Sequence, residues 1–160
     1  MKTCVFAGTF DPLTNGHVYV IEKCLESFGK VVVAVGENHD KTPTFTLNER
    51  IDMIKQTFSN NPNVEVKEFN GMLVEFMKKE GIKINVRGIR DEKDYAYETQ
   101  MSRYNLDMYP ELITVFIPTP AELQHISSTG VRSIMSYETQ ADKFVPPVVA
   151  NAIKQKFSKK

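Results

Sequence analysis

The sequence predicts a fold of the α/β class, in which a doubly wound sheet of five parallel strands carries helices on both faces. Strand-like and helix-like segments alternate along the whole chain, and parallel neighbours need such crossover helices to connect them. One strand-like segment, residues 30–36, is the continuous apolar run "KVVVAVG", which is typical of a parallel strand covered on both faces. The predicted arrangement is therefore Rossmann-like.

The chain opens with a strand, a helix and a second strand. Residues 3–7, "TCVFA", are predicted to form a buried strand, and apolar residues between 18 and 28 recur at helical spacing. Residues 30–36 then form the second strand. A polar connection follows, and Thr46 with Glu49 three residues later makes a capping box that begins the next helix.

The third and fourth strands enclose a short helix. Residues 63–69 alternate apolar and polar side chains, as a strand does. Residues 72–80 place apolar side chains on one helical face, and Gly81 ends that helix. Residues 83–88, "KINVRG", form the fourth strand.

The rest of the chain supplies the last strand and three helices. A long helix over residues 91–109 is stopped by Pro110. Residues 112–118 form the fifth strand. One helix begins within residues 126–137, and residues 148–157 form the last.

Length and composition predict one domain over residues 1–160. The formal net charge of zero argues against a nucleic-acid polymer as the main partner, since such binding depends on a basic face. Cys4 and Cys24 lack metal-ligand spacing and are expected to be reduced core thiols. The sequence shows neither a secretory leader nor an apolar run near the ~20 residues of a membrane span, so a cytoplasmic protein without membrane contact is expected.

Groups that suit a phosphate follow four of the five strands. Ligands of open parallel sheets bind beyond the carboxyl ends of the strands. These ends carry "GTFDPLTNGH" at residues 8–17, Lys41, "RGIR" at residues 87–90 and "ISSTGVR" at residues 126–132. Their coincidence indicates a phosphate ligand more strongly than any one of them does.

His17 has two interpretations. It lies in the first turn of a predicted helix, where it could be an ordinary surface residue. However, a helix N-terminus attracts anions and disfavours a cationic side chain, so a histidine there makes sense where a phosphate is bound. Spacing alone leaves both interpretations open.

The other polar groups also have structural alternatives. The hydroxyls of residues 127–129 could be N-caps, although one cap suffices and three hydroxyls suit a phosphate. Arg87 and Arg90 could pair with nearby carboxylates, but guanidinium groups bind phosphate in a bidentate fork. His39 beside Asp40 is a weak sign of a metal, which the polarity of the connection explains better.

Several familiar enzyme motifs are absent from the sequence. It contains no G-x-x-x-x-G-K-[ST] phosphate loop, no G-x-G-x-x-G dinucleotide fingerprint and no G-x-S-x-G nucleophile elbow. These classes of enzyme are therefore not predicted.

Taken together, the motifs resemble those of the nucleotidyltransferase superfamily. "GTFDPLTNGH" and "ISSTGVR" resemble its signature pair, whose first motif reads T/H-x-G-H. The segments "KTPTFTLNER", "RGIRDEKDYAYE" and "VPP" narrow the resemblance to the bacterial phosphopantetheine adenylyltransferases. The sequence departs from that family at Tyr19, where aspartate is common, and at Leu123, where an aromatic residue is common.

The resemblance implies an enzyme of coenzyme A biosynthesis. The family transfers the adenylyl group of ATP to 4′-phosphopantetheine and gives dephospho-coenzyme A and pyrophosphate. It uses Mg²⁺, which is held mainly by the ATP phosphates, so no residue of the chain is expected to ligate a metal. Members are typically homohexamers.

The resemblance also implies roles for individual residues. Those expected at the reacting centre are Thr9, His17, Lys41 and Arg90. Those expected to contact ATP are Thr9, Phe10, His17, Gly88, Ile89, Arg90, Glu98, Leu123, Gln124, His125, Ile126, Ser127, Ser128 and Thr129. Those expected to contact phosphopantetheine are Thr9, Lys41, Leu73 and Arg87.

The chemistry expected from the resemblance needs no activated nucleophile on the protein. The acceptor is a phosphate monoester with a second pKa of about 6, so it is mostly dianionic at neutral pH and attacks the α-phosphorus in line without a covalent enzyme intermediate. Two alternatives remain open at this point. One is a relative with another acceptor, such as nicotinate mononucleotide, or glycerol 3-phosphate with CTP. The other is a nucleotide-binding sensor without catalysis.

Overall fold

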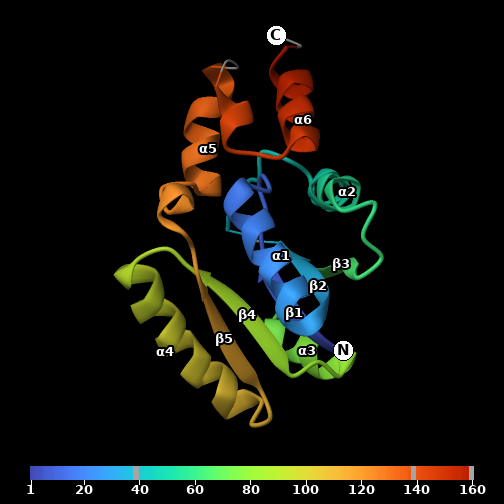
Figure 1. Cartoon of the computed structure of the whole chain (residues 1–160), viewed down its shortest axis with the longest axis vertical. Helices are drawn as coiled ribbons and strands as arrows, with labels where there is room; N and C mark the ends of the chain where they lie inside the picture. Colours follow the sequence, from blue (N-terminus) through green and yellow to red (C-terminus); the bar gives the residue numbers. More distant parts are fainter. Residues whose placement is uncertain (38–39, 138–139, 159–160) are drawn as a thin grey trace.

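Five parallel strands form one sheet in the order β3-β2-β1-β4-β5, so the predicted fold class is confirmed (Figure 1). The computed structural model describes residues 1–37, 40–137 and 140–158. The strands are β1 Lys2–Gly8, β2 Gly29–Gly36, β3 Val64–Phe69, β4 Ile84–Ile89 and β5 Ile113–Pro118. Each boundary lies within two residues of the predicted one.

Six helices accompany the strands in the described residues. They are α1 Asn15–Phe28, α2 Leu47–Thr57, α3 Leu73–Glu80, α4 Glu92–Met108, α5 Ser128–Ile134 and α6 Pro147–Phe157. The predicted capping box of Thr46 and Glu49 begins α2, because each side chain accepts a hydrogen bond from the other residue's main chain. Asp91 caps α4, so this helix begins where the sequence predicted a long helix over residues 91–109.

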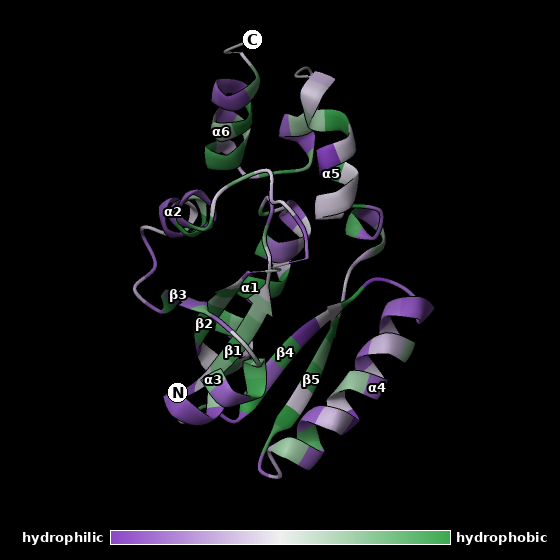
Figure 2. Cartoon of the chain, turned by 180° about the vertical axis from the view of Figure 1, so that it is seen from behind, coloured by the Kyte–Doolittle hydropathy of each residue, from purple (hydrophilic) through white to green (hydrophobic). Residues whose placement is uncertain are grey.

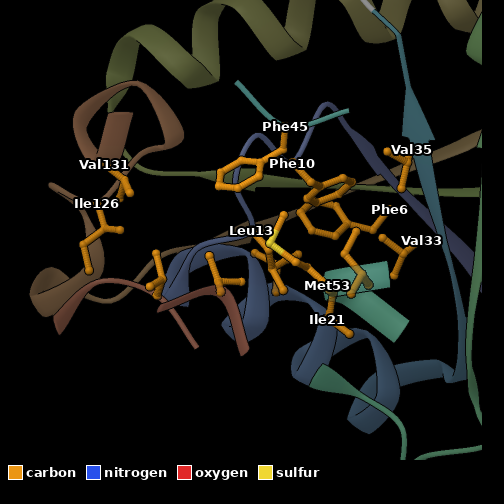
Figure 3. Packing of buried hydrophobic residues seen from close by; sticks show 14 of the residues in the cluster. Phe6, Phe10, Leu13, Ile21, Val33, Val35, Phe45, Met53, Ile126 and Val131 are labelled. Carbon is orange, nitrogen blue, oxygen red and sulfur yellow. The ribbon is translucent and has the colours of Figure 1, made fainter. Parts of the chain in front are cut away.

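The sheet divides the interior into two apolar clusters, because successive side chains of a strand point to opposite faces. On β1, Cys4 and Phe6 belong to the larger cluster, while Val5 and Ala7 belong to the smaller one. Figure 3 shows part of the larger cluster, in which Phe6 and Phe10 pack beside each other. Cys4 and Cys24 are both free and buried, as the composition predicted.

The helices separate onto the two faces. Helices α1, α2 and α6 contribute side chains to the larger cluster, and α3 contributes to the smaller one. Helix α4 lies along β4 and β5, with Tyr95 packed edge-on against Phe116 at 5.8 Å between ring centroids (Figure 1). Helix α4 has no fully buried residue.

Strands β1 and β4 are neighbours in the centre of the sheet, and the helices that follow them lie on opposite faces. A switch of this kind opens a crevice at the carboxyl ends of the two strands. The candidate site described below lies at this crevice.

Candidate active site

A cavity of about 320 Å³ opens where β1 and β4 end. We call it the first cavity. Its walls come from the ends of β1 and β4, the starts of α1 and α4, and the segment 126–129. Of the residues expected to contact ATP, the cavity brings together His17, Gly88, Arg90, Glu98, Leu123, Ile126, Ser127, Ser128 and Thr129, and it adds Arg87 from those expected to contact phosphopantetheine.

A second cavity of about 800 Å³ adjoins the first, since Ser128 and Thr129 line both. Two of the four residues expected at the reacting centre, Thr9 and Lys41, line this second cavity and not the first. Lys41 is exposed on its wall, in the connection between β2 and α2. The two cavities thus hold all four residues predicted for the reacting centre.

His17 is fixed by the start of its own helix. Thr14 caps α1: its hydroxyl accepts from the His17 main-chain N–H, and the Thr14 main-chain N–H donates to Nδ1 of the His17 ring at 3.0 Å. Because Nδ1 accepts this bond, it carries no proton in the neutral ring, and the proton lies on Nε2. His17 therefore acts as an N–H donor on the wall of the first cavity.

His17 is neutral near pH 7. Removal of the ring from water, and then the positive charges of Arg90 and Arg87, lower the pKa of His17 from 6.5 to about 4. The sequence placed His17 where a helix N-terminus disfavours a cationic side chain. The low pKa agrees with this, so the ring offers a phosphate a polarised N–H rather than a charge.

The ring of Phe10 packs against the ring of His17. The two rings meet edge-on, with 4.9 Å between centroids, and only 2% of Phe10 is exposed. Phe10 has a φ of 52°, a conformation that non-glycine residues rarely adopt. Its ring also lies 3.2 Å from where a Cβ at Gly8 would stand. Phe10 was expected to contact ATP, but its ring packs inward and does not line either cavity.

Arg87 is held by a carboxylate and by the central strand. Its Nε and Nη2 donate to the two carboxylate oxygens of Glu98 at 3.0 Å each, and its Nη1 donates to the Ala7 carbonyl at 2.8 Å. This bidentate arrangement fixes the guanidinium plane at the junction of β1, β4 and α4. Glu98 was expected to contribute to ATP binding; within the described protein it holds Arg87.

Arg90 is held by the first turn of α4. Its Nε donates to Oδ2 of Asp94 at 3.1 Å, and its main-chain N–H donates to the same oxygen at 3.0 Å. Both strand-end arginines therefore have the carboxylate partners that the sequence left open as an alternative. Pairing and ligand binding are compatible, because a guanidinium has five donors.

The formal charges of the two cavities differ. In the wall of the first, Arg87 and Arg90 stand against Asp94 and Glu98, so the charges balance. The wall of the second has three cations against two carboxylates: Lys41, Arg50, Arg132, Asp11 and Glu37. The net positive charge therefore lies in the second cavity, next to the hydroxyls that both cavities share.

The hydroxyls of residues 127–129 each have a separate task. Ser127 caps α5 by accepting from the Gly130 N–H, and the Ser128 hydroxyl donates to the Pro12 carbonyl at 2.8 Å. The Thr129 hydroxyl accepts from Arg132 at 3.1 Å. One cap suffices for the helix, as the sequence indicated. Of the other two hydroxyls, Ser128 joins α5 to the β1–α1 loop, and Thr129 binds Arg132 within the same helix.

Besides Phe10, four more expected site residues line neither cavity. Leu73 packs against the smaller apolar cluster, and Ile89 lies at the end of β4. Gln124 donates to the Thr119 carbonyl at 3.3 Å, and the His125 ring packs edge-on against Phe144. Their predicted contacts with substrates stay predictions, because such contacts would have to form when a ligand binds.

Sequence reasoning gave no role to several residues at the site. Arg132 donates to the Asp11 carbonyl at 2.8 Å and lines the second cavity. Its place three residues after Thr129 puts both on one helical face, which could have revealed it. Thr14 could have been found as a helix cap. Arg50 gave no signal, because the carbonyls of Thr9 and Gly36 that it binds are distant in the sequence.

The donors of the site suit the phosphates of a nucleotide. Among the described residues, no three His, Cys, Asp or Glu side chains stand close enough to hold a metal ion. His39, the weak metal candidate, lies outside the described residues.

No helix in the described part of the chain is long and apolar enough to cross a membrane.

Comparisons with known proteins show the family to which the chain belongs. The profile of the cytidylyltransferase-like family matches residues 5–134. The phosphopantetheine adenylyltransferase of Alkaliphilus metalliredigens is 36% identical over 156 residues, which cover 98% of this chain and 99% of that protein. The protein of the same name from Actinobacillus pleuropneumoniae serotype 3 is 42% identical over 154 residues, covering 96% of this chain and 98% of that protein.

A solved structure shows the same fold. The bifunctional NMN adenylyltransferase/ADP ribose pyrophosphatase from Francisella tularensis superposes on 99% of this chain with a TM-score of 0.74 and 17% identity. This chain spans 50% of the length of that bifunctional protein. At such low identity the likeness concerns the fold alone.

Proposed function

Because the chain belongs to the cytidylyltransferase-like family and, within it, to the phosphopantetheine adenylyltransferases, we propose that it transfers the adenylyl group of ATP to 4′-phosphopantetheine. The products are dephospho-coenzyme A and pyrophosphate, and the reaction is a step of coenzyme A biosynthesis. The observation that carries this assignment is the similarity to enzymes of that name over nearly the whole chain. The geometry supports it, because phosphate-binding groups from four strand ends surround two adjoining cavities.

The acceptor phosphate is the nucleophile in this proposal. Its second pKa of about 6 makes it mostly dianionic at pH 7, so no protein base has to remove a proton. An oxygen of this phosphate attacks the α-phosphorus of ATP, and the bond from the α-phosphorus to the bridging oxygen breaks in line. Pyrophosphate leaves, and no bond to the protein forms.

The protein contributes position and charge. The neutral His17 donates its Nε2 proton in a hydrogen bond toward the transferring phosphate, and Lys41 approaches from the second cavity. Such preorganised donors stabilise charge that develops in the transition state. The net positive wall of the second cavity suits the departing pyrophosphate.

Mg²⁺ is part of the proposal as an ion that arrives on the nucleotide. The donor set of the two cavities consists mainly of N–H groups and hydroxyls, which fit phosphate oxygens rather than a directly held cation. When bound, the ion neutralises charge on the phosphates. The residues placed to hold the loaded nucleotide are His17, Arg90 and the segment 127–129.

The decisive experiment measures pyrophosphate release with ATP, Mg²⁺ and 4′-phosphopantetheine, against the same mixture without acceptor. We expect release that depends on the acceptor, and dephospho-coenzyme A as its partner product. A parallel set with nicotinate mononucleotide, and with glycerol 3-phosphate and CTP, tests the alternative acceptors. Release with one of those instead would reassign the acceptor, and nucleotide binding without any release would indicate a sensor.

We also propose that the protein works in the cytoplasm as a homohexamer. The two free, buried thiols suit a reducing compartment. Large apolar side chains exposed on α4 support self-association: more than half of each of Tyr97 and Tyr104 is exposed, and nearly half of Leu106.

A further inference from the structure

We propose that Asp11 and Arg50 are positioning residues of the reaction, which together fix the connection carrying Lys41 against the loop carrying Thr9. The proposal rests on the proposed function, because it concerns where Lys41 and Thr9 stand relative to the transferring phosphate. Neither residue is expected to touch the reacting atoms. Both act through the main chain of other segments.

Asp11 joins the β1–α1 loop to the end of the connection between β2 and α2. Its carboxylate is buried, with 4% of the residue exposed. One oxygen accepts from the Thr44 N–H and the other from the Phe45 N–H, both at 2.9 Å. Because both oxygens accept main-chain donors of adjacent residues, the carboxylate fixes the place where the connection reaches α2.

Arg50 joins the same loop to both ends of the connection. Its Nη1 donates to the Thr9 carbonyl at 2.8 Å and to the Gly36 carbonyl at 3.0 Å, and its Nε donates to the Phe45 carbonyl at 3.1 Å. Gly36 is the last residue of β2, and Phe45 lies just before α2. A single guanidinium thus connects three separate segments of the main chain.

The burial of Arg50 indicates that this linkage has a purpose beyond packing. Only 2% of the residue is exposed, and it lies beside Met53 and Ile54 on the buried face of α2. An apolar side chain would fill that place without the cost of taking a cation out of water. The arginine instead satisfies its donors with carbonyls whose positions it then determines.

Lys41 lies between the two points that are held. Gly36 precedes it and Thr44 follows it, and both are tied to the loop from Thr9 to Asp11. Lys41 and Thr9 line the same cavity, together with Asp11 and Arg50. These hydrogen bonds therefore fix the main chain on both sides of Lys41 relative to Thr9, and the flexible lysine side chain spans only the remaining distance.

A double-mutant cycle tests whether the two residues act through Lys41. The variants Asp11→Asn, Arg50→Lys and Lys41→Ala are made singly, and each of the first two is combined with Lys41→Ala. We expect Asp11→Asn and Arg50→Lys each to lower kcat by at least about tenfold, with a KM for ATP within about threefold of the wild type. Added to Lys41→Ala, either change should lower kcat by less than about twofold further, because the group they position is gone.

Glu49→Gln is the matched control. It makes the same carboxylate-to-amide change one residue before Arg50, but Glu49 faces Lys156 and lies outside both cavities. Its kcat should stay within about twofold of the wild type. Two results would overturn the proposal in favour of general destabilisation. One is a double variant whose loss of kcat equals the product of the two single losses, and the other is a loss of kcat in Glu49→Gln as large as in Asp11→Asn.

Amide hydrogen exchange of the wild type provides a second test that needs no variant to fold. The Thr44 and Phe45 amides donate to a buried carboxylate, so they should exchange at least about 100-fold more slowly than in an unstructured peptide. Unprotected amides there would refute the linkage. The result is independent of activity, so a wild type that released no pyrophosphate would overturn the proposed function and leave the exchange result standing.

Discussion

His17 performs two tasks with one ring. Nδ1 completes the cap of α1, and Nε2 carries the N–H that a ligand in the first cavity can accept from. The cap therefore selects the tautomer, and burial with two nearby arginines keeps the ring neutral. His17 therefore acts as a directed hydrogen-bond donor and not as a cation.

Removing the His17 ring should affect turnover more than binding. In His17→Ala we expect kcat to fall on the order of 10²- to 10³-fold, as when one donor to a transition state is lost. The KM for ATP should change much less, because the arginines and hydroxyls that hold the nucleotide remain. Steady-state kinetics with both substrates provide the test, and an unchanged kcat with weaker binding of both substrates would contradict it.

His17 should also make stability depend on pH. The folded pKa of about 4 lies below the ordinary 6.5, so between these values the unfolded chain binds a proton that the folded chain excludes. The stabilising contribution is complete above pH 6.5 and is lost as the pH falls toward 4. It amounts to roughly 3 kcal/mol of the free energy of unfolding, from the size of the shift.

Urea unfolding of the wild type and of His17→Gln at several pH values measures this contribution. Glutamine at the third helical position can complete a capping box but does not titrate. The variant should therefore lose less stability than the wild type between pH 7 and pH 4.5. Parallel curves for the two proteins would show that another group causes the pH dependence.

At the scale of elements, the sequence predicted the strands better than the buried faces of the helices. Continuous apolar runs and strand ends are local features, so β2 and the polar residues after β1 and β4 could be read directly. In α2 the apolar residues Leu47, Ile51, Ile54 and Phe58 recur at helical spacing, which marks a buried face, yet Arg50 and Met53 are more buried than three of these. Two of the three carbonyl partners of Arg50, those of Thr9 and Gly36, are distant in the sequence, and no local pattern reveals them.

The joining of α4 to β4 should control the acceptor side of the site. Glu98→Gln replaces one of the two oxygens that hold Arg87 with an amide that cannot accept. We expect the KM for phosphopantetheine to rise by about tenfold, because the bidentate fork that orients Arg87 is lost. The KM for ATP should change little.

Glu92→Gln is a suitable control for this variant, because Glu92 is exposed on the first turn of the same helix. Measured KM values for both substrates separate the two possible roles of Glu98. A rise in the KM for ATP alone would mean that Glu98 contacts the nucleotide, which is the role the family resemblance implies.

At the scale of the whole molecule, α4 and the edge strand β5 form an incompletely covered side. Figure 2 shows that α4 mixes hydrophobic and hydrophilic residues along its length, and it has no fully buried residue. Ile113 of β5 is 57% exposed. Apolar surface gathered on one side of a molecule favours association.

Light scattering after size-exclusion chromatography should give six times the chain mass of 18.2 kDa. Tyr104→Glu places a charge on the exposed part of α4 and should shift the mass toward smaller species, since burying an unpaired charge is costly. The mass of one chain for the wild type would refute the hexamer. An unchanged mass for the variant would place the interface elsewhere.

The pairing of Arg87 with Glu98 and of Arg90 with Asp94 also disfavours the binding of small inorganic anions at the site. A lone chloride or sulfate would have to compete with Glu98 or Asp94 for a guanidinium that is already neutralised, and would bring little else. A substrate gains many further contacts along its length and can share these donors. Selectivity against simple salts is thus built into the resting protein by its own internal counterions.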